Sequence, residues 1–153
     1  MKTRPYTISF ANVSVAVIQD LFSILSTSGM AWELHEIRVG QITTTSIAVA
    51  RVRLLKLTGG FSQGSVGSTP NPQPLFGTQA ATVTAHCNDT TQASGGTITT
   101  LISDVFNYVN GFLYLPAEDD RPVFAPSQLG AFVIDNIPIT ATMNGSATIG
   151  ELF

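Results

Sequence analysis

Residues 81–88 read ATVTAHCN, and this stretch shows the pattern that decides the fold. Small or apolar side chains alternate with polar ones over the whole octet. Ala81, Val83, Ala85 and Cys87 occupy one set of positions, and Thr82, Thr84, His86 and Asn88 occupy the other. A β-strand places successive side chains on opposite faces, so the pattern predicts a strand with one buried face. Cys87 is then expected to be buried as a small hydrophobic residue, with His86 pointing to the opposite face.

The same alternation recurs along the chain and predicts further strands. It is seen at residues 6–10, 13–17, 47–57 and 139–144. Only residues 19–25, QDLFSIL, resemble a helix, and they suffice for a single turn. Several short strands with loop signals between them are typical of a β-sandwich, a jelly roll or a related barrel. We therefore predict an all-β protein, an antiparallel β-sandwich that is jelly-roll-like.

Turn-forming residues separate these predicted strands. Residues 58–74, TGGFSQGSVGSTPNPQP, are rich in Gly, Ser and Pro and predict a long exposed loop, and residues 90–96, TTQASGG, predict another. Asn110-Gly111 and Asn144-Gly145 are typical of tight turns between strands. The length of 153 residues fits one domain. We divide the chain into residues 1–12, an N-terminal arm or first strand, and residues 13–153, a single β-sandwich domain.

The composition is poor in charge and rich in hydroxyl groups. Charged residues make up 11% of the chain, whereas Thr and Ser account for 19 and 13 residues. The net charge of −3 argues against a nucleic-acid partner, because phosphate neutralisation needs clustered Lys and Arg. No apolar run has the roughly 18 to 20 residues that a membrane span needs. Such a surface stays wettable with little charge repulsion between copies, which favours a protein that is packed among neighbours.

Synthesis in a reducing compartment is expected. The first residues, MKTRPYTISF, have basic side chains but no apolar segment after them, so we expect no signal peptide. The single cysteine, Cys87, excludes an internal disulfide. Both observations fit synthesis in a cytoplasm.

The densest charge lies in residues 113–126, LYLPAEDDRPVFAP. Glu118, Asp119, Asp120 and Arg121 are consecutive, and a proline lies on each side of the run. The run has four interpretations: an acid/base pair, a cation site, a docking patch or a solvated loop. Acid/base catalysis needs one desolvated carboxyl group, and Ca²⁺ needs six to eight oxygen ligands, so both are disfavoured in an exposed loop. The solvated loop is the default interpretation. Among the functional ones, we favour contact with a partner protein through these four residues, because exposed loops on a rigid sandwich carry recognition.

Other residues that could support catalysis or bind a metal give weaker signals. Glu33 and His35, in WELHEIRV, would point the same way from a strand and form half of a metal site, but the only other histidine is His86 in a different strand. Cys87 has no neighbour on its own face to lower its pKa. The sequence contains no nucleophile elbow, P-loop or dinucleotide-binding motif. We therefore expect no enzyme activity, no catalytic residue, no cofactor and no resident metal.

The order of segments resembles a family of small proteins encoded among the structural genes of tailed bacteriophages. The most specific pieces are QDLF at residues 19–22, the P-x-x-x-D-R run at residues 116–121 and the closing MNGSATIGELF at residues 143–153. The resemblance covers about residues 15 to 153. The chain departs from the family pattern in its first twelve residues and at Phe112 and Tyr114, where relatives often have Trp.

The resemblance implies a capsid cement protein, also called a decoration or auxiliary head protein. Such proteins are jelly-roll-like sandwiches that assemble, commonly as trimers, on the outside of the head. The implied partners are the major capsid protein and further copies of this chain, and the implied location is the surface of the virion head. Two alternatives stay open within the virion, a receptor- or glycan-binding module of a tail fibre or spike and a head–tail connector part. A small metal-dependent jelly-roll enzyme is a third.

Overall fold

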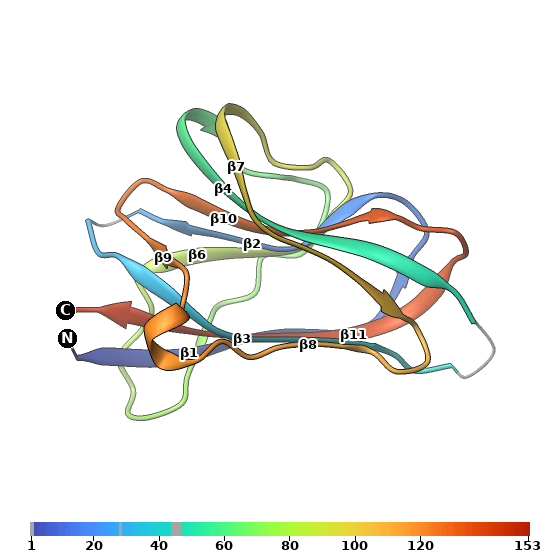
Figure 1. Cartoon of the computed structure of the whole chain (residues 1–153). Helices are drawn as coiled ribbons and strands as arrows, with labels where there is room; N and C mark the ends of the chain where they lie inside the picture. Colours follow the sequence, from blue (N-terminus) through green and yellow to red (C-terminus); the bar gives the residue numbers. More distant parts are fainter. Residues whose placement is uncertain (1, 28, 44–46) are drawn as a thin grey trace.

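The computed structural model describes residues 2–27, 29–43 and 47–153, and its strands form two antiparallel sheets that face each other (Figure 1). The first sheet has the strand order β5-β1-β11-β3-β8, with β9 also paired to β3. Its strands are β1 (Thr3–Val15), β3 (Trp32–Gln41), β5 (Gln73–Pro74), β8 (Phe112–Tyr114), β9 (Val123–Phe124) and β11 (Ala141–Leu152). The second sheet has the order β6-β2-β10-β4-β7. Its strands are β2 (Gln19–Ser26), β4 (Val49–Ser62), β6 (Val83–Asp89), β7 (Ser94–Asn107) and β10 (Leu129–Asn136).

The strand order is that of a jelly roll. The chain pairs as one long hairpin wrapped around a barrel: β1 pairs with β11, β2 with β10, β3 with β8, and β4 with β7. From β1 to β4 successive strands alternate between the two sheets, and on the return arm β7 and β10 lie in the second sheet while β8, β9 and β11 lie in the first. The predicted antiparallel, jelly-roll-like sandwich is therefore confirmed. The strand β6, which lies between β4 and β7 in the sequence, extends the second sheet beside β2. The strand β1 includes residues on both sides of the boundary that we drew after residue 12.

The core lies between the sheets and is rich in aromatic side chains. The rings of Trp32 and Phe124 stack with their centroids 4.1 Å apart, and the ring of Phe112 contacts those of Phe106 and Phe132. The main core collects the inward positions of both sheets. Cys87 is among these residues and is fully buried, as its alternation predicts.

A second apolar cluster lies outside the sandwich, on the outer face of the second sheet. It consists of Leu55, Leu57, Leu129, Ala131 and Val133. Leu25, Phe61 and Ala93 pack against these residues. The far end of the β4–β7 hairpin curls over this face (Figure 1), so parts of the second sheet are buried on both sides.

The expected helical turn at residues 19–25 is wrong, because these residues lie in β2. Most of this strand is buried on both faces, with its outer face covered by the cluster above and by residues 63 and 93. Burial on both faces removes the polar–apolar alternation by which a strand is recognised. Leu21 lies at an irregularity in the pairing of β2, which further disturbs the pattern.

The expected loops at residues 58–74 and 90–96 are also partly wrong. The strand β4 continues to Ser62, and β7 begins at Ser94. Gln73 and Pro74 pair with β1 as the short strand β5. Gly59, Gly60, Gly95 and Gly96 all have positive φ and face each other across the β4–β7 hairpin. Only glycine adopts such angles freely, so these four residues form a corner inside the hairpin.

The two Asn-Gly signals have different outcomes. Asn110-Gly111 lies between β7 and β8, with φ of 70° at Gly111, so this predicted turn is confirmed. Asn144-Gly145 lies within β11, so that turn prediction is wrong. Gly145 leaves room for the ring of Phe10, and the side-chain oxygen of Asn144 accepts a hydrogen bond from the backbone N–H of Asn12 at a bulge in β1.

Candidate functional site

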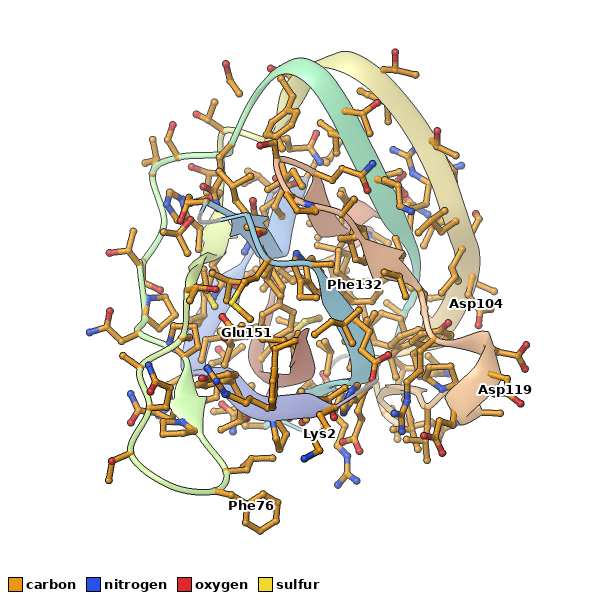
Figure 2. All side chains as sticks on the ribbon, turned by 90° about the vertical axis from the view of Figure 1, so that its left-hand side faces the viewer. Lys2, Phe76, Asp104, Asp119, Phe132 and Glu151 are labelled. Atoms are coloured by element: carbon orange, nitrogen blue, oxygen red, sulfur yellow. The ribbon has the colours of Figure 1, made fainter. Side chains whose placement is uncertain are left out.

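The acidic run forms a short 3-10 helix, Glu118–Asp120, between β8 and β9. The backbone N–H of Asp120 donates to the carbonyl oxygen of Ala117, which closes the turn. The side chains of Glu118, Asp119 and Asp120 are exposed, and Figure 2 shows Asp119 at the periphery of the molecule. We call these three residues the acidic turn. The turn presents three carboxylates to solvent without placing one in a desolvated site.

Arg121 points inward from the acidic turn and joins it to β3. Its Nη1 atom lies 3.2 Å from Oε1 of Glu33, and Nε2 of His35 lies 2.6 Å from the same oxygen. Glu33 and His35 therefore share one face of their strand, as predicted. Their proximity to Arg121 was not predicted from the sequence. The contact joins residues 88 positions apart, so no local pattern reports it. The shared carboxylate anchors the acidic turn on the sheet.

A pocket of about 320 Å³ lies beside this contact. Its lining includes Thr3, Glu33, Glu118, Arg121 and Leu152. Glu33 is paired with Arg121 and hydrogen-bonded to His35, and the other carboxylate of the lining is that of Glu118, which belongs to the exposed acidic turn. We interpret these residues as support for the acidic turn.

A second polar cluster lies on β2 and β6 under the segment that follows β4. Asp20 and Asp89 are cross-strand partners and each is 1% exposed. Nδ1 of His86 lies 3.1 Å from Oδ2 of Asp89 and 3.0 Å from the carbonyl oxygen of Gly64. Burial raises the pKa of Asp20 to about 7, with a further contribution from the charge of Asp89. Burial also raises the pKa of Asp89, and His86 opposes that change.

The chemistry available to the buried groups is limited. Within residues 2–27, 29–43 and 47–153, no group of three or more His, Cys, Asp or Glu side chains is arranged to hold a metal ion. Burial raises the pKa of the Cys87 thiol to about 12, so it is protonated at neutral pH and does not act as a thiolate.

Among the same described residues, no helix is both long enough and apolar enough to span a membrane.

The edge strand β7 has a long exposed stretch. Its first eight residues, SGGTITTL, are all exposed, and its only charged residue is Asp104. It pairs with β4 on one side and lies at the end of the strand order of its sheet, so its other side is open. Proteins that act alone usually protect such an edge with charges, prolines or a covering segment.

Comparison with protein-family models, with curated proteins and with solved structures gives no match for this chain. The fold and these surfaces define an all-β jelly-roll sandwich that has an open, nearly uncharged edge strand and a separate acidic turn.

Proposed function

We propose that this chain is a structural virion protein of a tailed bacteriophage, a capsid cement protein that binds the outer surface of the head and stabilises the shell. The observation that carries the proposal is β7, a long edge strand that is open, exposed and nearly free of charge. In a free protein such a strand promotes unwanted pairing with other chains, whereas in an assembly neighbouring subunits cover it. The jelly-roll strand order and the segments that resemble cement proteins agree with this role.

The acidic turn has a separate part in this proposal. Three exposed carboxylates, held in place by the contact between Arg121 and Glu33, form a small patch of negative charge. Charge patches at the rim of an interface fix the orientation of the partners and discriminate against wrong ones. The acidic turn then sets the register of the protein on the major capsid protein, while uncharged surfaces supply the contact area.

The test is co-sedimentation with expanded phage heads that lack the protein. We expect the wild-type chain to bind and to raise the temperature at which the heads release their DNA. Replacement of Glu118, Asp119 and Asp120 by Ala should weaken binding by about tenfold, the effect of ~1.4 kcal/mol. The matched control is Glu36→Ala, which removes an acid that is already ion-paired with Arg38 on β3.

Two results would contradict the proposal in different ways. Heads whose thermal release is the same with and without the protein would remove the cement role. Equal binding by the triple variant and the wild type would leave the cement role in place and remove the acidic turn from it.

One observation favours a glycan-binding module as the second candidate. Tyr114, the last residue of β8, is half-buried and precedes the acidic turn by a few residues. Burial raises the pKa of its hydroxyl group, and the charge of Asp120 raises it further. Sugars stack on such rings while carboxylates accept hydrogen bonds from their hydroxyl groups. Binding on a glycan array that Tyr114→Ala abolishes would support this candidate over the cement role.

A further inference from the structure

The edges of the two sheets differ in how well they are protected. The outer edge of β6 is covered, because Ser68 and Cys87 exchange backbone hydrogen bonds of 2.9 and 2.8 Å across it. The edge strand β5 has only two residues, the second of which is Pro74, and β8 has three residues and is followed two positions later by Pro116. On β1, the pairing with β5 covers only Tyr6 and Thr7, and a bulge between Phe10 and Val13 interrupts the edge that remains. Among the described strands, β7 thus has the longest open edge.

We propose that β7 pairs edge to edge with β7 of a second copy of this chain, antiparallel and about a two-fold axis. The unpaired N–H and C=O groups of one open edge can form hydrogen bonds with those of another, and in a copy of this chain the longest open edge is again β7. Pairing of the same surface on both subunits closes after two copies, whereas pairing of two different edges would continue into a filament.

The geometry of β7 limits where this pairing occurs. The glycine corner at residues 95–96 bends the strand near its start, and a bulge at Leu101 divides the remainder into two regular segments. The second segment, residues 102–107, contains Asp104, whereas the first, Thr97–Thr100, has the uncharged sequence TITT. We place the pairing on the uncharged segment. All four residues are β-branched, which suits them to a pleated surface.

The two-fold axis restricts the register within this segment. An axis perpendicular to the sheet keeps the outer face of one copy beside the outer face of the other, so residues that lie opposite each other must come from the same face. Any axis centred on a single residue satisfies this condition, and we place it on Thr99, which keeps the paired residues clear of the glycine corner at residue 96. Thr99 then lies opposite Thr99 of the second copy, and Ile98 lies opposite Thr100. These Thr–Thr and aliphatic–Thr pairs are favourable across antiparallel strands.

Charge does not oppose the pairing. The only charged residue of β7 is Asp104, which lies beyond the regular segment. In the register centred on Thr99, the two Asp104 residues are ten positions apart along the strand direction, roughly 34 Å at the usual rise. This separation exceeds the Debye length of about 8 Å at physiological salt, so the repulsion between them is negligible.

The pairing deepens the proposed function and rests on it for its biological purpose, because it gives the adhesion between copies a specific surface. A single pair of short strand segments buries little area, so the isolated dimer should be weak. Attachment of both copies to one scaffold would raise their effective concentration and make the pair persistent. The chemistry of the pairing itself does not depend on phage heads.

A disulfide at the two-fold axis tests the register directly. Residues directly opposite in an antiparallel pair have Cα atoms about 4.5 to 5.5 Å apart, within the range that a disulfide bridges. We expect Thr99→Cys to form an inter-chain disulfide with oxidised glutathione, while Thr97→Cys, whose symmetry mate is displaced by about 14 Å along the strand direction, does not. Both sites are exposed, whereas the native Cys87 is buried. Equal cross-linking of the two variants, or of neither, would overturn the register.

Sedimentation equilibrium tests the pairing without any cross-link. We expect a reversible dimer with twice the chain mass of 16.2 kDa, and amide-exchange protection of residues 97–101 that increases with protein concentration. Changing both Ile98 and Thr100 to Lys places like charges opposite each other and should weaken the dimer by about tenfold or more. Mixing this variant with one that has Glu at both positions should restore the dimer. The matched control changes Leu113 and Leu115, two exposed residues outside β7, to Lys.

The outcomes separate this inference from the proposed function. A chain that stays monomeric at millimolar concentration, forms a trimer, or dimerises equally well with Lys at residues 98 and 100 would overturn the pairing. If the chain dimerises and its variants behave as expected, but the wild type does not bind phage heads, the cement role would be overturned and the pairing would stand.

Discussion

Two buried carboxylates show how strongly the surroundings of a residue decide its behaviour. Glu151 is fully buried inside the molecule (Figure 2), and its Oε1 atom accepts hydrogen bonds from the hydroxyl group of Thr82 at 2.8 Å and from the backbone N–H of Val83 at 3.0 Å. Asp20 is equally buried, and its Oδ2 atom accepts a hydrogen bond from the backbone N–H of Ala93 at 2.7 Å. In each of the two carboxylates the other oxygen has no hydrogen-bond partner. Asp20 also faces the second acid, Asp89. Ionised Asp20 is therefore a source of instability.

We predict that Asp20→Asn stabilises the protein at pH 8. Folding raises the pKa of Asp20 from 3.8 to about 7, so the folded state binds this proton more tightly than the unfolded state. The wild type should therefore lose stability as the pH rises from about 4 to above 7, and the Asn variant should be spared this loss. We expect a gain on the order of 2 kcal/mol at pH 8 that disappears near pH 4, measured by urea unfolding at both values. The control, Asp119→Asn on the exposed acidic turn, should show no such change, and a gain that is the same at both pH values would contradict the prediction.

Alternation was sufficient to predict the environment of Cys87 and the opposite orientation of His86, because a strand fixes the faces of its own residues. It did not predict the burial of Asp20. The segment near residue 93 contacts that residue from far along the chain, and no pattern around residue 20 reports this contact.

At the scale of the elements, the β4–β7 hairpin owes its shape to its four glycines. Thr58 pairs with Thr97 and Phe61 pairs with Gly95, so Gly59, Gly60 and Gly96 form the irregularity between these two pairs. Beyond the corner, Phe61 packs on the outer apolar cluster of the second sheet. The glycines thus convert an extended hairpin into one that covers its own sheet. Glycine-rich sequence usually indicates a loop, which explains why residues 58–62 and 94–96 were not predicted as strand.

We predict that Gly96→Ala destabilises this hairpin. Gly96 has a φ of 62°, and a Cβ atom there would collide with the carbonyl oxygens of Gly59 and Thr58. The cost should be about 2 kcal/mol or more from strain and collision, measured by thermal or urea unfolding. Gly40→Ala is the matched control, because Gly40 lies in β3 with no heavy atom near its would-be Cβ. Equal stability of the Gly96→Ala variant and the control would show that the corner is dispensable.

At the scale of the whole molecule, local patterns predicted the fold class but not the long-range contacts at its surface. The alternating strands implied a sandwich, and the jelly-roll order follows from pairing the first strand with the last and so on inward. The contact between Arg121 and Glu33 was not predicted, because it depends on the long-range pairing of β3 with β9. The acidic run itself was evident from the sequence, and the structure adds how it is held.

The two proposed surfaces should respond differently to salt, and this difference tests the division of roles between them. The paired segment of β7 has no charged residue, whereas the acidic turn has three exposed carboxylates. Raising the salt concentration from about 0.1 M to about 1 M shortens the Debye length from ~10 Å to ~3 Å. We expect the self-association constant from sedimentation equilibrium to change by less than about threefold, and binding to phage heads to weaken by about tenfold. In the variant with Ala at residues 118–120, head binding should become almost independent of salt. Strongly salt-dependent self-association would place charge at the interface between copies and move the self-contact from β7 to the acidic turn.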